Sequence, residues 1–360
     1  MRKYYLDNLR SLTIILVMIY HAFYIFNGVG LPTGLNVEVG FLPFDAFCTA
    51  VYPWFMVLLF CIAGITARYS INKRGRKLFI QERFRRLIIP STLGLLVFQW
   101  ITGYFNILVG GGLDKMPKFL IYPISALSGI GPLWFGQTVF IFSLLLLMLN
   151  RFHNSKKVND FCEKIPSAII IALGILVFLG AQVLNVPIIS VYRFGIYGVA
   201  YFIGYFFFHF DSVMERVEKI LPITIPISLI FCGIYMWLYM GDNYASDAVL
   251  KSIITNLYAW FATLAILGAG KRWLNIKNAV FDLFNGMSFG LYVLHYSVLI
   301  SSAYLLNEYT ELSVALKGII LLIIIILITP MLYILIKNIP FVRYCVLGIK
   351  RRKNEIQVNN

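Results

Sequence analysis

Two ionisable side chains bracket the apolar stretch RSLTIILVMIYH, with Arg10 at its start and His21 at its end. On a helix, their spacing of three turns plus about 20° places both on one face, about 16 Å apart along the axis. Asp7 lies one turn before Arg10. A neutral imidazole, with a pKa of about 6.5, can take a proton from a hydroxyl, but a histidine within hydrocarbon is costly unless it faces protein or water. His21 is therefore interpreted as a hydrogen-bonded contact between helices or as a general base in a buried cavity.

A second group of charged side chains lies in the stretch RGRKLFIQERFRRLIIP. Arg83 and Arg86 are three residues apart and share one face of the helix that enters the next apolar run. Arg85 points elsewhere, where lipid headgroups can meet it, and is included as the third arginine of the predicted site. Guanidinium groups match phosphates better than lysines do. The stretch predicts an anion clamp at the cytoplasmic mouth of the protein, or a basic segment beside the membrane.

Two further stretches carry polar side chains that could line a cavity. In MSFGLYVLH, the residues Ser288, Tyr292 and His295 fall on one helix face. In GIGPLWFGQTVF, Trp134 is expected near the outer surface, as in an aromatic belt, and Gln137 lies one turn deeper. All five are interpreted as cavity-lining residues or as ordinary contacts between helices.

The sequence gives no sign of a metal centre or a nucleotide-binding loop. The five cysteines are scattered, without a CxxC pair or a Cys/His cluster, so neither a metal site nor a disulfide framework is expected. The motifs GxxxxGK[ST], HExxH and GxSxG are absent.

The helices that must position these residues are membrane helices. Of the 360 residues, 60% are hydrophobic and only 13% are charged, and the mean hydropathy is +0.80. The apolar runs are about 20 residues long, which matches a hydrocarbon core of about 30 Å. We expect an all-α polytopic membrane protein with about ten transmembrane helices. The expected spans are residues 9–27, 47–67, 87–109, 131–149, 167–185, 191–208, 222–240, 253–270, 283–305 and 313–336.

The charge distribution predicts the orientation in the plasma membrane. With the N-terminus in the cytoplasm, 26 of the 31 lysines and arginines fall on the cytoplasmic side, and an even number of spans places both termini there. This asymmetry explains the net charge of +15 without a nucleic-acid partner. The first span is expected to be retained, since Asp7 and Arg10 interrupt the pattern of a cleaved signal and no small-residue cleavage site follows His21. Residues 1–340 are predicted to form one transmembrane domain and residues 341–360 a basic cytoplasmic tail.

These motifs, taken in order, resemble the integral-membrane acyltransferase 3 family. The opening YLDNLRSLTIILVMIYHA is similar to the family's first helix, in which a basic residue precedes a histidine by ten intervening residues. RFRRLIIP resembles the family's Arg-x-x-Arg motif before a proline, and GPLWF and SFGLYVLH resemble later signatures. The run CIAGITARYSINKRG is most similar to the branch that contains glucan-modifying succinyltransferases.

The resemblance implies transfer of an acyl group, usually acetyl, from acyl-CoA to a hydroxyl of a glycan or another cell-envelope molecule. It makes His21 the base that activates the acceptor, Arg10 a residue that orients the donor, and Arg83 and Arg86 the contacts to the donor's phosphates. Direct transfer in a ternary complex is expected, with an acyl-histidine intermediate as the alternative. We expect the ring of His21 to face a water-filled tunnel shared with the donor. Tyr292, Ser288 or a backbone amide are the candidates for stabilising the oxyanion.

Two other classes of protein fit parts of the same pattern. A transporter or flippase of a glycan or lipid intermediate would also need many spans around a polar cavity, but no internal repeat is evident in the sequence. A membrane sensor or scaffold would use the arginines only to bind anionic lipid. These two would not consume a thioester, which separates them from an acyltransferase.

Overall fold

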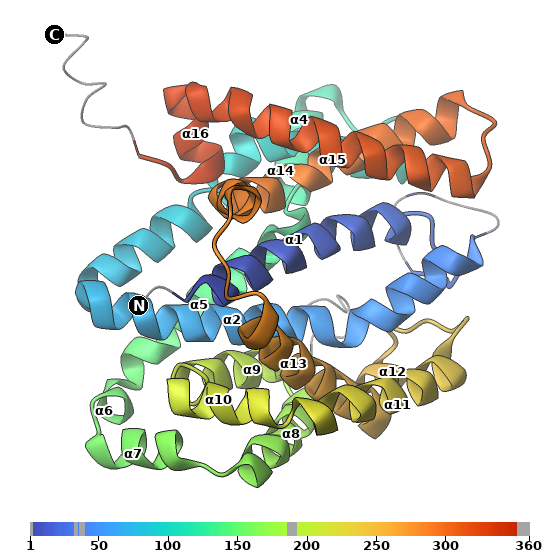
Figure 1. The fold of residues 1–360 in the computed structure, drawn as a ribbon. Coiled ribbons are helices and arrows are strands. Elements are labelled where there is room, and N and C mark those ends of the chain that lie inside the picture. The colour runs from blue at the N-terminus through green and yellow to red at the C-terminus, as the bar shows by residue number, and fades with distance from the viewer. Residues whose placement is uncertain (1–2, 32–34, 36–39, 186–192, 351–360) are drawn as a thin grey trace, which may run out of the picture.

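The computed structural model describes residues 3–31, 35, 40–185 and 193–350, and these are almost entirely helical (Figure 1). Within them no β-strand is formed, and one isolated antiparallel bridge joins Asn185 and Arg193. The helices are α1 (Tyr4–Tyr24), α2 (Leu42–Arg83), η1 (Phe84–Ile88), η2 (Leu95–Gln99), α3 (Trp100–Val109), α4 (Lys118–Ser128), η3 (Gly131–Leu133), α5 (Trp134–Met148), α6 (Asn150–His153), α7 (Lys156–Lys164), α8 (Ser167–Gln182), α9 (Phe194–Phe206), α10 (Asp211–Lys219), α11 (Leu221–Tyr239), α12 (Asp247–Lys251), α13 (Ile253–Trp273), α14 (Ala279–Tyr309), α15 (Val314–Asn338) and α16 (Pro340–Leu347).

The all-α polytopic prediction is confirmed. Among the described residues, seven helices are long and apolar enough to cross a membrane, and an eighth span results if α7 and α8, bent by 105°, are counted together. Each of the ten predicted spans overlaps a helix. In the expected span 87–109, two π-helical segments, η1 and η2, precede α3. In the expected span 191–208, the helix α9 is short. The exact number of ten spans and the placement of the termini remain predictions.

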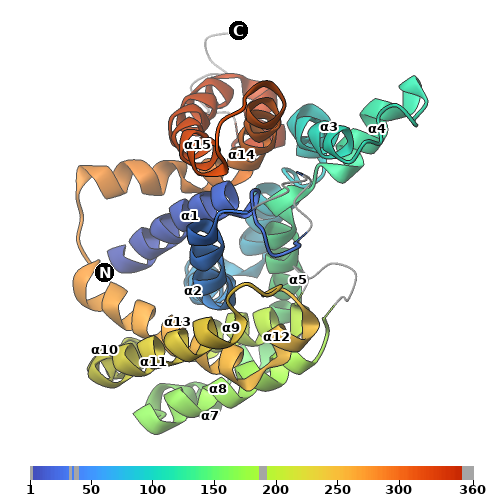
Figure 2. The same ribbon diagram turned by 90° about the vertical axis from the view of Figure 1, so that its right-hand side faces the viewer.

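Helix α1 lies in the middle of the molecule, between two groups of helices. Figures 1 and 2 show α14 and α15 on one side of α1 and α2, and α8 to α13 on the other. The buried apolar side chains follow the same division. Tyr5, Leu9 and Val17 of α1 belong to the large cluster with α2, α9 and α13, whereas Ile14 and Met18 belong to the cluster with α14, α15 and α16. Helix α1 is therefore packed on two sides.

The long helix α2 changes direction at a glycine. Gly75 has φ +72° and ψ 168°, outside the helical range, and a Cβ there would meet nothing within 4 Å. L-residues rarely adopt this conformation, so glycine is the residue that permits the bend. Figure 1 shows α2 turning near its end and folding back toward the middle of the molecule. The bend brings Arg83 and η1 back over the part of α2 that precedes it.

Helices α2 and α9 pack with their backbones in close contact. A Cβ on Gly64 would lie 1.9 Å from the carbonyl oxygen of Tyr201, and one on Gly204 would lie 2.1 Å from that of Cys61. Small residues at such crossings let membrane helices approach closely, which increases dispersion contacts where lipid offers no hydrophobic driving force between helices. This close contact holds α9 against one face of α2.

The Gly64→Ala variant is expected to lose about 1–3 kcal/mol of stability, because the new methyl group must push two backbones apart. The matched control is Gly233→Ala on α11, where a Cβ would meet nothing within 4 Å. Thermal unfolding of the purified proteins in one detergent provides the measurement. Equal melting temperatures for the two variants would contradict the close contact.

Candidate functional site

A buried hydrogen-bond network joins the start of α1 to the start of α14. The side chain of Asn8 is fully buried, and its Nδ2 donates to the carbonyl oxygens of Leu274 (2.8 Å) and Ile276 (2.9 Å). Its Oδ1 accepts from Nδ2 of Asn285 (2.8 Å), and the hydroxyl of Ser11 donates to Oδ1 of Asn285 (2.5 Å). These amides satisfy the carbonyl groups that follow α13, and they set the register between α1 and α14.

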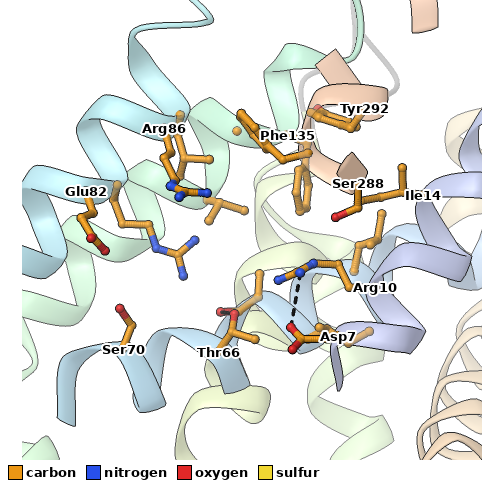
Figure 3. A pocket seen from close by; sticks show the side chains of 18 of the residues that line it. Asp7, Arg10, Ile14, Thr66, Ser70, Glu82, Arg86, Phe135, Ser288 and Tyr292 are labelled. Atoms are coloured by element: carbon orange, nitrogen blue, oxygen red, sulfur yellow. Dashed lines mark hydrogen bonds and ion pairs between the residues drawn. The ribbon is translucent and has the colours of Figure 1, made fainter. Parts of the chain in front are cut away.

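A cavity of about 470 Å³ opens between α1, α2, η1, α5 and α14 (Figure 3). It is strongly basic, because four arginines and only two carboxylates line it. Figure 3 shows Arg10 and Arg86 reaching into the same space from two sides. The charged and polar lining residues are Asp7, Arg10, Thr66, Ser70, Arg74, Glu82, Arg83, Arg86, Asn285, Ser288 and Tyr292.

The two carboxylates in this cavity are already paired. Oδ1 of Asp7 lies 3.3 Å from Nη2 of Arg10, and Glu82 forms an ion pair with Arg74 across the bend in α2. Among the described residues, no ion pair involves Arg83 or Arg86. Two guanidinium groups thus face the cavity with their charge uncompensated, which is the arrangement that attracts a polyanion.

The backbone of the arginine segment is held by the C-terminal helix. Gly348, which follows α16, has φ +60°, and a Cβ there would lie 2.3 Å from the carbonyl oxygen of Arg85 and 3.0 Å from Cα of Arg86. The segment itself, η1, is π-helical. Such turns are frequent at functional sites. Here the turn directs Arg86 into the cavity while Arg85 lines neither of the two cavities described here.

A second cavity, of about 200 Å³, surrounds His21. Its walls are mostly aromatic, and Trp134, only 9% exposed, is one of them rather than a residue at a lipid boundary. The lining residues are Val17, Tyr20, His21, Tyr24, Tyr52, Phe55, Met56, Leu59, Gly131, Pro132, Trp134, Phe135, Tyr197, Ala245, Tyr292 and Tyr296. Three residues, Leu59, Phe135 and Tyr292, line both cavities. Because they share these three lining residues, the two cavities adjoin.

His21 contacts a second histidine behind the cavity wall. Nδ1 of His21 lies 3.2 Å from Nε2 of His295, which is completely buried. Nδ1 of His295 lies 2.8 Å from the carbonyl oxygen of Tyr292 and 3.1 Å from that of Leu291. The hydroxyl of Tyr292 donates to the carbonyl oxygen of Pro132. His21 therefore has a hydrogen-bonded partner on one side and a cavity on the other.

The structure brings together most of the residues that the sequence singled out. The larger cavity contains Asp7, Arg10, Arg83, Arg86, Ser288 and Tyr292, and the smaller one contains His21, Trp134 and Tyr292. Arg85, Gln137 and His295 line neither. Nε2 of Gln137 donates instead to the carbonyl oxygen of Ser91 at 3.5 Å.

Sequence reasoning missed several lining residues. Arg74 and Glu82 reach the larger cavity only because α2 folds back at Gly75, and a glycine between two basic residues was the one local sign of this bend. The aromatic wall of the smaller cavity was also missed. Tyr24, three residues after His21, shares its helix face and could have been found by spacing. The other missed aromatic residues are Tyr20, Tyr52, Phe55, Phe135, Tyr197 and Tyr296.

The fold and these two cavities define a polytopic helical membrane protein in which a basic cavity adjoins an aromatic cavity that contains a histidine. The family model described as an acyltransferase domain, Acyl_transf_3, matches residues 3–336, nearly the whole chain. The chain belongs to this acyltransferase 3 family of membrane acyltransferases. No curated protein and no solved structure matches it.

Outside both cavities, a partly buried histidine is held neutral by its neighbours. Nδ1 of His153 accepts a hydrogen bond from Nη1 of Arg68, and the hydroxyl of Tyr205 lies at the same distance of 2.5 Å from this nitrogen. Burial, and then the charge of Arg68, lower the pKa of His153 to about 4. Burial likewise lowers the pKa of His209 to about 3.

The pKa of His153 predicts a stability that falls in acid. An unfolded histidine takes up a proton near pH 6.5, before the folded one does, so stability is complete above about pH 6.5 and is lost as the pH falls toward about 4. His153→Gln, which keeps an acceptor for Arg68, should therefore lose less of its melting temperature between about pH 7 and about pH 5 than the unaltered protein does. Identical losses in both proteins would show that His153 is not the titrating group.

Proposed function

We propose that the protein is an O-acyltransferase of the plasma membrane with both termini in the cytoplasm. It moves an acyl group, acetyl in the simplest case, from cytoplasmic acyl-CoA to a hydroxyl of a cell-envelope glycan or a related acceptor. The observation that carries the proposal is the contact between the two cavities. An arginine-lined space that suits a polyanionic donor adjoins, through Leu59, Phe135 and Tyr292, a space that contains His21.

The donor's phosphates fit the chemistry of the larger cavity. Arg83 and Arg86 have no carboxylate partner among the described residues, and Arg10 projects toward the same space from α1. Guanidinium groups bind phosphate oxygens through paired, charge-assisted hydrogen bonds. The flexible arm of coenzyme A would then carry the thioester past the shared wall toward His21.

The acceptor fits the smaller cavity. Aromatic faces pack against the apolar C–H faces of a sugar ring, and tyrosine hydroxyls at their edges can exchange hydrogen bonds with its hydroxyl groups. Tyr24, Tyr52 and Tyr296 supply such groups around His21. The described residues that line this cavity include no aspartate, glutamate, lysine or arginine, so an uncharged acceptor is favoured.

The reaction needs one base and no metal ion. His21 takes the proton of the acceptor hydroxyl while its oxygen attacks the thioester carbonyl. The C–S bond of the resulting tetrahedral intermediate then breaks, the acyl ester forms, and the thiolate of coenzyme A receives the proton from His21. Ser288, a backbone amide or Tyr292 at the junction of the two cavities would stabilise the oxyanion, and Tyr292 would first have to release the carbonyl oxygen of Pro132, to which its hydroxyl donates.

Arginine variants test the donor site. Arg86→Gln should weaken binding of coenzyme A about tenfold or more, since a hydrogen bond between charged groups contributes about 1.5–3 kcal/mol. Titration calorimetry with coenzyme A on the purified protein gives the affinity. Arg85→Gln removes the same charge from a residue that lines neither cavity, and its effect should be smaller. Equal losses in the two variants would indicate general attraction by a basic surface, as expected of a scaffold that binds anionic lipid.

A change at His21 tests the chemistry. His21→Ala should reduce transfer from radiolabelled acetyl-CoA to cell-envelope glycan by about 10²–10⁴-fold, because a general base contributes that much. Its affinity for coenzyme A should stay unchanged, since the ring lines the other cavity. Full transfer by this variant would eliminate His21 as the base. Movement of a glycan across vesicle membranes without consumption of thioester would instead identify a flippase.

A further inference from the structure

We propose that His295 is a positioning residue that holds the proton of His21 on Nδ1, so that Nε2 is the basic nitrogen of His21. The consequence for catalysis rests on the proposed function. The placement of the proton rests only on the hydrogen bonds described here.

The contacts of His295 determine which of its nitrogens carries hydrogen. Its Nδ1 lies within hydrogen-bond distance of two backbone carbonyl oxygens, those of Tyr292 at 2.8 Å and Leu291 at 3.1 Å. A carbonyl oxygen only accepts, so Nδ1 of His295 must be the donor. A neutral imidazole has one N–H group, which leaves Nε2 of His295 with a lone pair and no proton.

The state of His295 then determines that of His21. Nδ1 of His21 lies 3.2 Å from Nε2 of His295, and a hydrogen bond between them needs one donor. Since Nε2 of His295 is the acceptor, Nδ1 of His21 carries the proton. The ring of His21 also has a hydrogen bond to the backbone of Val17, one turn earlier on α1. On a helix, Nδ1 is the nitrogen that reaches the preceding turn, as it does in His295, so this contact supports the same tautomer. Nε2 of His21 is consequently the nitrogen with the free lone pair, on a side chain that lines the smaller cavity.

The position of His295 is itself well determined. Its side chain has no exposed surface, and its ring packs at 5.3 Å from that of His21 and at 6.3 Å from that of Tyr296. Ten residues earlier on the same helix, Asn285 is bonded to Asn8 of α1. Two polar contacts, one near the start of α1 and one near its end, therefore fix α14 against α1. A small shift of α14 that broke the histidine pair would also strain the amide pair.

An imidazole suits this position better than a carboxylate would. The partner of a catalytic histidine fixes its tautomer and steadies the imidazolium that forms when the proton is taken up. Within a membrane, an ionised carboxylate is costly to bury without a cation. His295 provides a neutral acceptor, and the described lining of the smaller cavity contains no acidic residue that could act in its place.

The test uses the full-length protein in detergent with histidine side chains labelled by ¹⁵N. The ring signals of His21 are assigned by comparison with His21→Ala among the four histidines. Nitrogen chemical shifts distinguish the two tautomers. The unaltered protein should show Nδ1–H for His21, and His295→Leu, which has no acceptor, should show a mixture. Nε2–H as the main form in the unaltered protein would overturn the proposal, whether or not the protein transfers acyl groups.

Measurements of acyl transfer distinguish a positioning role of His295 from a role in packing alone. His295→Leu should lower transfer from radiolabelled acetyl-CoA to cell-envelope glycan by about 10²-fold, the lower range for loss of a correctly poised base. His295→Gln offers an amide oxygen as acceptor and should recover most of this loss. Affinity for coenzyme A should be equal in both variants, which confirms that they are folded. A Gln variant as inactive as Leu, with the Nδ1–H form of His21 intact, would assign His295 another role. Absence of transfer by the unaltered protein would count against the proposed function only.

Discussion

The contact between α1 and α14 is the constraint on which the rest of the structure depends. Lipid offers no hydrophobic driving force for two apolar helices to associate, so polar contacts and close packing decide their register. Here the amide pair of Asn8 and Asn285 fixes one end, and His21 and His295 meet at the other. A slip of α14 by one residue would turn both of its polar side chains away from α1. The same register places Ser288 and Tyr292 of α14 in the basic cavity.

The division into two cavities has an electrostatic reason. A base must accept a proton, and a guanidinium close to it would oppose the positive charge that the proton brings. Arg10 and His21 are on the same helix, yet Arg10 faces the basic cavity and is paired with Asp7, while His21 faces the aromatic one. Phe135 lies in the wall that both share. In the proposed reaction, donor binding by the arginines and proton transfer by His21 would take place in adjacent cavities, and the charge of the arginines would not oppose protonation of His21.

The sequence predicted the parts of this arrangement that depend on local spacing. The apolar runs predicted the helices. The motifs around His21 and Arg83 predicted residues that line each of the two cavities. What it could not predict depends on contacts between distant segments. The partnership of His21 with His295 joins residues 274 apart in sequence. The bend at Gly75 leaves no periodic signal. The π-helical turns within the expected span 87–109 follow from tertiary packing, which hydropathy does not record.

The C-terminal segment shows how far that dependence on distant contacts extends. The sequence placed a domain boundary at residue 340, and basic composition was the reason. In the described part of this segment, α16 buries Val346 and Leu347 in the same cluster as α14 and α15. The left-handed turn at Gly348 then lets the chain touch the backbone of Arg85, at a distance that leaves no room for a Cβ. The contact lies at η1, the π-helical segment that carries Arg86, so the C-terminal segment packs directly against the backbone that directs this arginine into the basic cavity. The arginine site is therefore built from both ends of the chain.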